Sequence, residues 1–425
     1  MPDFQRGIDF AKSLDDSDEL AQYRSKFYIP KDEKGNDLIY FCGNSLGLQP
    51  KSTKSYIEQE LKDWADLGVE GHLHAKNPWL PYHEFLTDSM AELVGAKPIE
   101  VVTMNTLTAN LHFMMVSFYQ PTSKRYKILI ENDAFPSDKY AVESQLRHHG
   151  FDDKEGLLTW KPRPGEELLH VEDLEILLQE HGKEIALIMI GGVNYYTGQY
   201  FDLKRITDLG HSYGCMVGFD CAHGAGNVIL DLHDSGADFA VWCTYKYLNS
   251  GPGSLSGCFV HERHAHNRDL NRFTGWWSHN KQTRFNMRNA FDVLPGAEGW
   301  QLSNPPILSL AAIKASLDIF NEVGIQRLVE KSKMLTSYFE FLLNDLGDET
   351  VKIITPVHPD ERGCQLSIQV KNADKRVHDQ LTRSGVISDW REPDVIRCAP
   401  VPLYNSYEDV YNMVERLKTI LNGKR

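Results

Sequence analysis

Two segments, Asp220-Cys-Ala-His-Gly-Ala-Gly226 and Tyr245-Lys-Tyr-Leu-Asn-Ser-Gly-Pro-Gly253, each follow a short apolar run. Those runs, 215–219 and 236–244, have the length and composition of strands that are buried on both faces of a parallel sheet. Asp220 directly follows the first run, and Lys246 follows the second. Because ligands of open α/β sheets bind at the carboxyl ends of the strands, the two segments predict a ligand site that contains an acid and a lysine.

An aspartate and a lysine have complementary roles if the ligand is pyridoxal phosphate. The lysine amine condenses with the aldehyde, and the carboxylate pairs with the pyridine nitrogen and keeps it protonated. An arbitrary pair of this kind is more often a buried acid and a surface lysine that never meet. The pyridoxal hypothesis for Asp220 and Lys246 therefore depends on the rest of the sequence.

The composition excludes several classes of protein. The chain of 425 residues has 45 basic and 59 acidic side chains, a formal net charge of −14, which argues against a nucleic-acid-binding protein with a basic face. Its seven cysteines include no CxxC pair and lie mostly in apolar runs, so we expect reduced thiols and a cytoplasmic protein. We expect no membrane span and no signal peptide, because no apolar run is long enough or suitably placed.

Short apolar runs alternate with helical segments between residues 100 and 260. This alternation predicts a mainly parallel sheet with helices on both faces. Two long helices are expected next, at 307–322 and 325–345, and the remainder has the strand–helix pattern of a smaller α+β lobe. We predict three parts: an N-terminal arm with a small-domain segment (1–50), a large ligand-binding domain (51–310) and a C-terminal small domain (311–425).

A candidate phosphate site follows the strand expected at 100–104. The segment Asn105-Thr-Leu-Thr-Ala-Asn-Leu111 begins a helix directly after that strand. The N-terminus of a helix has free amide groups and the positive end of the helix dipole, so it binds phosphate well. Thr106 and Thr108 would add hydroxyl contacts. The alternative is that Asn105 or Thr106 only caps the helix.

Eight segments resemble the kynureninases, a family of pyridoxal-phosphate enzymes with the aspartate-aminotransferase fold (fold type I). They occur in the family order along nearly the whole chain: Gly43-Asn-Ser-Leu-Gly-Leu-Gln-Pro50, Phe135-Pro-Ser-Asp138, Gly192-Val-Asn-Tyr-Tyr-Thr-Gly-Gln199, Asp220-Cys-Ala-His223, Tyr245-Lys-Tyr-Leu-Asn249, Gly275-Trp-Trp277, Ser303-Asn-Pro-Pro-Ile307 and Arg397-Cys-Ala-Pro-Val-Pro-Leu-Tyr404. The resemblance implies an α/β large domain with a mainly parallel, seven-stranded type of sheet flanked by helices, and a smaller α+β C-terminal domain. One departure is Gly191, where some members have Ser.

The resemblance also implies a role for each matched residue. Lys246 would be the Schiff-base lysine and the general base, and Tyr245 would donate and accept protons. The residues implied to bind the cofactor are Leu107, Thr108, Phe135, Pro136, Ser137, Asp138, Asp220, His223, Tyr245, Lys246, Trp276 and Asn304. Trp276 would come from the partner subunit of a homodimer. The residues implied to bind the substrate are Ser45, His72, Asn304 and Arg397, whose planar guanidinium suits an α-carboxylate.

The implied reaction is the hydrolysis of L-kynurenine or 3-hydroxy-L-kynurenine to anthranilate or 3-hydroxyanthranilate and L-alanine, in tryptophan catabolism and NAD biosynthesis. His72, Ser303 and Asn304 resemble the members that favour the 3-hydroxy substrate. Three alternatives remain open: an aminotransferase, a cysteine desulfurase of the same fold type, and a non-catalytic cofactor-binding protein. A desulfurase needs a cysteine on a mobile loop, whereas the cysteines here lie mostly in expected strands.

Two histidine-rich segments are expected to be loops. His261-Glu-Arg-His-Ala-His266 has the composition of a metal site, but its spacing fits no zinc pattern. We therefore expect a solvated loop there and no metal. The segment 68–81, which contains His72, is also expected to be a loop.

Overall fold

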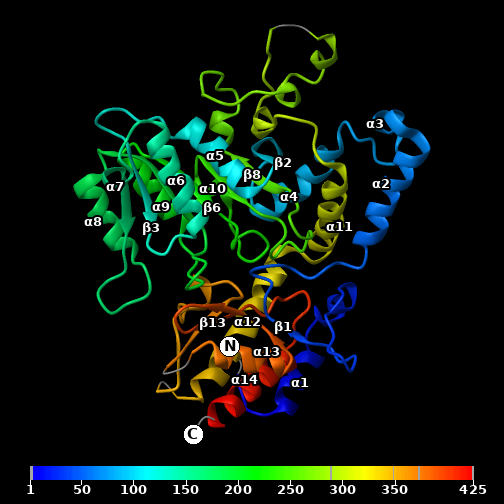
Figure 1. The fold of residues 1–425 in the computed structure, drawn as a ribbon, viewed down its shortest axis with the longest axis vertical. Coiled ribbons are helices and arrows are strands. Elements are labelled where there is room, and N and C mark those ends of the chain that lie inside the picture. The colour runs from blue at the N-terminus through cyan, green and yellow to red at the C-terminus, as the bar shows by residue number, and fades with distance from the viewer. Residues whose placement is uncertain (1–2, 288–289, 348, 372–373, 424–425) are drawn as a thin grey trace.

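The computed structural model describes residues 3–287, 290–347, 349–371 and 374–423. The chain forms two lobes, the larger at the top of Figure 1 and the smaller at the bottom. Helix α12 (Ile325–Asn344) links them, because its first residues pack in the core of the larger lobe and its later residues in the core of the smaller one. Both termini lie by the smaller lobe in Figure 1.

A seven-stranded sheet with the order β2-β8-β7-β6-β5-β3-β4 forms the centre of the larger lobe. Neighbouring strands from β7 to β4 are parallel, and β8 runs antiparallel to both β7 and β2. The strands are β2 (Val101–Met104), β3 (Lys127–Glu131), β4 (Leu157–Trp160), β5 (Ile185–Gly191), β6 (Met216–Asp220), β7 (Phe239–Trp242) and β8 (Ser256–Val260). The inner strands are buried almost throughout, as the apolar runs predicted. The mainly parallel sheet is confirmed.

Helices surround this sheet (Figure 1). They are α2 (Thr53–Leu67), α3 (Gly71–His74), α4 (Thr87–Val94), α5 (Leu107–Phe118), α6 (Pro136–His148), α7 (Asp153–Gly156), α8 (Val171–His181), α9 (Leu203–Ser212), α10 (Leu232–Ser235) and α11 (Ile307–Val323). The prediction of a loop over 68–81 was partly wrong, because a 3-10 turn (Gly68–Glu70) and α3 occupy its first half. The segment after β8 projects from the larger lobe at the top of Figure 1 and contains further 3-10 turns at Trp276–Ser278, Arg284–Asn286 and Ala297–Trp300.

The smaller lobe contains an antiparallel sheet with the order β12-β13-β10-β9. Its elements are β9 (Val351–Ile353), β10 (Leu366–Val370), α13 (Arg376–Arg383), β11 (Val386–Ile387), β12 (Asp389–Arg391), β13 (Val395–Cys398) and α14 (Tyr407–Asn422), together with α1 (Ile8–Asp16) and β1 (Ile39–Tyr40) from the start of the chain. β1 pairs in parallel with β11, and the Asp15 carboxylate accepts hydrogen bonds from the first backbone amides of α14. The smaller α+β lobe is confirmed.

Two buried clusters bear on the predicted domain limits. Leu310, Ile313 and Leu317 of α11 belong to the same cluster as the central sheet. The cluster of the smaller lobe includes residues of α12 from Leu335 onward. The division at residue 310 stays a prediction. Among the described residues, no helix is both long and apolar enough to cross a membrane.

Candidate active site

A cavity of about 280 Å³ lies at the carboxyl ends of β3, β5 and β6. The N-termini of α5 and α6 and the loop between β7 and β8 complete its wall. The lining residues are Thr106, Leu107, Thr108, Glu131, Phe135, Ser137, Asp138, Gly191, Val193, Tyr195, Asp220, Ala222, His223, Tyr245, Lys246, Gly253, Ser254 and Ser256. Nine of the residues expected to bind the cofactor are therefore brought together in one cavity.

Lys246 lies in the loop after β7 and points toward two of these residues. Its Nζ is 3.1 Å from Nε2 of His223 and 5.7 Å from the centre of the Phe135 ring. Burial, and then the charge of Lys246, hold the pKa of His223 well below its ordinary value. His223 is therefore neutral, and we assign its Nε2 as the acceptor of a hydrogen bond from the Lys246 amine.

Asp220 and Asp138 form a buried pair of carboxyl groups. Asp220 ends β6, and its Oδ1 accepts the backbone N–H of Ala222 at 2.7 Å. Burial raises the pKa of Asp138 well above its ordinary value, and the charge of Asp220 and a hydrogen bond to it add to the effect. Burial also raises the pKa of Asp220, but the charge of Lys246 and the hydrogen bonds from Ala222 and Asp138 lower it. Asp138 is thus the proton donor of the pair, and Asp220 is the acceptor.

The N-terminus of α5 has the form of an anion site. Thr106 is the N-cap residue, yet its side chain makes no capping hydrogen bond. The Asn105 side chain instead donates to Asn110. The amides of the first turn, at Leu107 and Thr108, are therefore not capped by either side chain proposed for that role. The Thr108 hydroxyl lies 3.0 Å from that of Ser137 in the first turn of α6, so two helix N-termini meet at this wall.

Arg397 is buried on β13 of the smaller lobe and does not line the cavity. Its Nη1 donates to the backbone carbonyl of Tyr195 at 2.6 Å, and its Nη2 donates to Asp389 on β12. Nε of Arg397 is buried and has no hydrogen-bond partner. The guanidinium thus connects the smaller lobe to a residue of the cavity wall and retains one unused donor.

Ser45, His72, Trp276 and Asn304, although expected in the site, do not line the cavity of the single chain. Ser45 and Asn304 are exposed, and Trp276 is 43% exposed, with its Nε1 donating to the carbonyl of Arg284. His72 lies on α3, where its ring contacts Trp79. Pro136, the first residue of α6, adjoins the lining without belonging to it.

Glu131 and Tyr195 are two of the cavity residues that had no predicted role. Glu131 is the last residue of the apolar strand β3 and could have been found by the rule that found Asp220. Tyr195 lies within one of the family segments, and its ring centre is 5.3 Å from that of Phe135, at 82° between the ring planes. The partner of Arg397, Asp389, was missed because the three-residue strand β12 has no clear pattern in the sequence.

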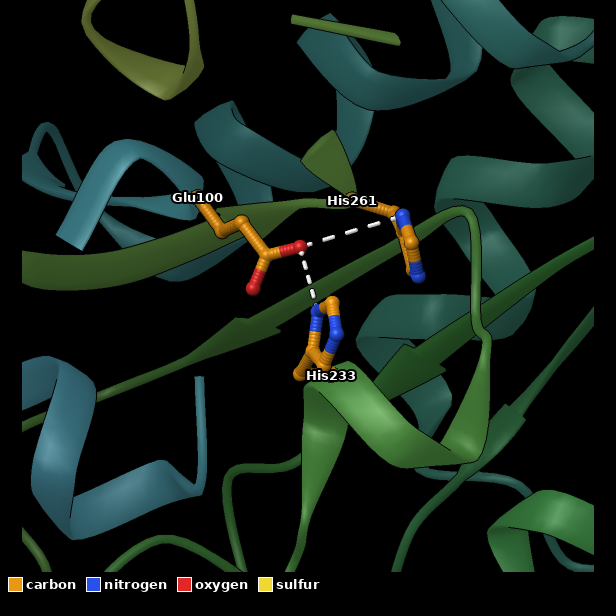
Figure 2. Close-up of side chains that lie close together, drawn as sticks. All are labelled: Glu100, His233 and His261. Carbon is orange, nitrogen blue, oxygen red and sulfur yellow. Dashed lines mark hydrogen bonds and ion pairs between the residues drawn. The ribbon is translucent and has the colours of Figure 1, made fainter. Parts of the chain in front are cut away.

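Glu100, His233 and His261 form a second cluster, in which the side chains lie close together (Figure 2). None of the three lines the cavity. Oε1 of Glu100 accepts from Nδ1 of His233 at 2.9 Å and from the backbone N–H of Glu262, and Oε2 accepts from the backbone N–H of Lys97. Nδ1 of His261 accepts the backbone N–H of Arg263. The Glu100 carboxylate and Nδ1 of His261 are thus used in hydrogen bonds to the backbone, and we interpret the cluster as structural. The expected solvated loop was wrong for His261, which is largely buried.

Comparison with known proteins gives one family. Residues 328–417 match the kynureninase C-terminal domain. The kynureninase of Myxococcus xanthus is 57% identical over 98% of this chain and 97% of its own length, and that of Koribacter versatilis is 54% identical over 99% of both chains. The kynureninase of Nematostella vectensis is 48% identical over 96% of this chain and 93% of its own.

Two solved structures show the same fold at low sequence identity. A C-DES mutant with glycine linked to its PLP cofactor has a TM-score of 0.78 at 16% identity, covering 93% of this chain and 98% of its own. A cysteine desulfurase of Escherichia coli has a TM-score of 0.76 at 17% identity, covering 95% and 98%. Both support the fold alone. The far higher identity to the curated relatives, over nearly the whole length, decides the family: the chain belongs to the kynureninases.

Proposed function

We propose that this chain is a pyridoxal-phosphate enzyme that hydrolyses L-kynurenine, 3-hydroxy-L-kynurenine or both, to anthranilate or 3-hydroxyanthranilate and L-alanine, in tryptophan catabolism. Membership of the kynureninase family supports the reaction. The observation that carries it is the meeting of Lys246, His223 and Asp220 in one cavity beside an aromatic ring.

The cavity fits pyridoxal phosphate. Its walls carry buried polar atoms that lack a hydrogen-bond partner, among them Oδ1 of Asp138 and Oγ of Ser256. The N-terminus of α5 would hold the phosphate, Asp220 the ring nitrogen, and Phe135 one face of the ring. These groups lie on different walls of the same cavity, as a ligand with an anionic end, a basic nitrogen and an aromatic face requires.

The bound cofactor supplies a protonated ring that withdraws electrons from the substrate α-carbon. Lys246 would hold the cofactor through its amine and, once displaced by the substrate amine, would take the α-proton. The neutral His223 orients that amine through the 3.1 Å contact. Hydrolysis then breaks the Cβ–Cγ bond: water supplies its hydroxyl to the carbonyl carbon, which becomes the carboxyl carbon of anthranilate, and its proton to Cβ. Return of the proton held by Lys246 to the α-carbon would then give alanine.

Tyr245 is proposed as the proton donor at the substrate. Burial raises its pKa, so the phenol stays protonated at neutral pH. We expect Tyr245→Phe to lower kcat by about 10²-fold, the usual contribution of a positioned acid. The cofactor should be saturating in this assay, since Tyr245 also lines the cofactor cavity. Full turnover by Tyr245→Phe would contradict the proton-transfer role of Tyr245 and would leave it only a role in binding the cofactor.

Two subunits are proposed to build each site. Trp276 is exposed and outside the cavity. The surface of α2, α3 and the 3-10 turn between them exposes Leu61, Trp64, Val69 and Leu73, an apolar set suited to a subunit interface. In a homodimer, Trp276 of one subunit would reach the cofactor of the other. The free thiols, six of which are buried, fit the reducing conditions of the cytoplasm, where we propose that the protein acts.

Mixing two inactive variants tests the shared site. Lys246→Ala and Trp276→Ala should each give a nearly inactive homodimer. After co-refolding, half of the dimers should be hybrids with one intact site, so activity should return to about one quarter of the wild-type value. Absence of recovery in a mixture that mass spectrometry shows to contain hybrids would contradict the proposal. A monomer in light scattering would contradict it as well.

The reaction itself is tested by adding each candidate substrate to the holoenzyme and following the fluorescence of the aromatic product. The ratio of the two rates then settles the preference for kynurenine or 3-hydroxykynurenine. An aminotransferase would instead need a keto-acid acceptor. A desulfurase would release sulfur from cysteine, but it needs an accessible thiolate. Cys42, which is only partly buried, has a pKa that burial raises to about 11, and the other cysteines are buried.

A further inference from the structure

Three carboxyl groups and one amine share the candidate active site. Glu131, Asp138 and Asp220 are only 4%, 5% and 5% exposed and lie at the end of β3, in the first turn of α6 and at the end of β6. Lys246 is the cation of the cavity lining, because His223 is neutral. Three ionised carboxylates would repel one another and lose their hydration in so closed a space. At neutral pH some of them must therefore hold protons.

The contacts described above assign the first of these protons to Asp138. Asp138 donates to Asp220, whereas Asp220 accepts from the Ala222 amide and faces Lys246. Each of these contacts stabilises the ionised form of Asp220. Asp220 is thus the anion of the cavity, and the state of Glu131 remains to be assigned.

Glu131 accepts a backbone amide as Asp220 does, but neither Lys246 nor a second carboxyl group is among the contacts that lower its pKa. Its Oε1 accepts the backbone N–H of Gly191 at 3.1 Å, and Gly191 is the β5 residue that pairs with Asp220 in the sheet. Its Oε2 is buried and makes no hydrogen bond. The charged groups that act on it are the acids Asp220 at the end of β6 and Asp133 just after β3, while Asp138 on α6 holds a proton. Burial is the main cause that raises the pKa of Glu131 to about 7; two backbone hydrogen bonds oppose it, and the charges of Asp220 and Asp133 add to it.

We propose that Glu131 is a positioning residue that carries a proton in the working enzyme and, through Oε2, donates a hydrogen bond into the cofactor cavity. Its neutral form leaves Asp220 as the single anion for the ring nitrogen of the cofactor. This role rests on the proposed pyridoxal-phosphate function. A Cβ atom at residue 191 would lie only 3.0 Å from Oε1 of Glu131, so the carboxyl group also fills the space beside Gly191.

The variant Glu131→Gln tests whether the Glu131 side chain holds a proton. The amide keeps the shape, one acceptor and one donor, but it cannot ionise. Because the folded-state pKa of Glu131 is raised above its ordinary 4.5, the wild-type apoprotein loses stability as pH rises from about 4.5 to 7. Glu131→Gln escapes this loss. Its Tm relative to the wild type should therefore rise between pH 5 and pH 8, by about 3 °C.

The variant Glu131→Leu tests the hydrogen bond. Leucine has a similar size but neither donor nor acceptor, so the dissociation constant of pyridoxal phosphate should increase about tenfold, measured by titrating the apoprotein and following the visible absorbance. Glu155→Gln is the matched control, because Glu155 of α7 is exposed, does not line the cavity and is not among the acids that act on Glu131. The control should change neither the pH dependence of Tm nor cofactor affinity.

The possible results separate this inference from the proposed function. If the wild type binds pyridoxal phosphate and cleaves kynurenine, but Glu131→Gln keeps the wild-type pH dependence of Tm, the proton assignment is wrong. Unchanged cofactor affinity in a folded Glu131→Leu would contradict the hydrogen bond. If the wild type itself neither binds the cofactor nor cleaves kynurenine, the proposed function fails instead.

Discussion

Replacement of Lys246 by alanine is expected to abolish turnover, with a loss of kcat of at least about 10⁴-fold. The side chain has two proposed roles, as the covalent anchor of the cofactor and as the base that removes the α-proton, and the cavity lining provides no second lysine for either role. The variant would also lose the hydrogen bond that the Lys246 amine donates to His223.

Mass spectrometry after borohydride reduction provides a direct readout for the same variant. The wild type should carry the mass of the reduced cofactor on the peptide that contains Lys246, and Lys246→Ala should carry none. Lys139→Ala, an exposed lysine on the neighbouring helix α6, serves as the control and should behave as the wild type. Labelling of another lysine in the wild type, or substantial turnover by Lys246→Ala, would contradict the assignment.

Replacement of Arg397 by lysine is expected to raise KM for kynurenine about 100-fold, while cofactor affinity stays within about twofold. The guanidinium is held by Tyr195 and Asp389, and its Nε is buried without a hydrogen-bond partner. We propose that this Nε donates to the substrate carboxylate. A lysine ammonium has no planar fork and cannot reproduce three donors in this arrangement.

Controls for Arg397 separate substrate binding from folding. Arg391→Lys alters a half-exposed arginine that also pairs with Asp389 and should have a much smaller effect on KM. A change confined to kcat or to cofactor affinity in Arg397→Lys would contradict a carboxylate-binding role. Equal loss of activity in both variants would show that the paired strands, and not the substrate contact, are at fault.

Much of the cavity could be predicted because its residues follow local rules. Asp220 ends an apolar strand, Lys246 follows another, and Leu107 begins a helix directly after a third. Each element is short, buried and bounded by turn residues, so its limits are visible in the sequence. The carboxyl-end rule then places all of these residues at one edge of the sheet.

Other features depend on contacts that no local pattern encodes. The carboxyl-end rule also applies to Glu131. However, Glu131 reaches the cavity because the strand order places β3 next to β5, and this order is not visible in the sequence. Asp389 lies on a three-residue strand, and only pairing with β13 brings it to Arg397. The exposed Trp276 and Asn304 can be assigned a role only by reference to a second subunit, so their place in the site stays a prediction.

The central claim is hydrolysis of the Cβ–Cγ bond in a cavity loaded with pyridoxal phosphate. The most direct measurement is the amount of anthranilate and of alanine formed from L-kynurenine by the wild type, with and without added cofactor. We predict the two products in equal amounts, formed repeatedly on each active site and lost when the cofactor is removed. Consumption of kynurenine without alanine, or no consumption by the cofactor-loaded protein, would contradict the account.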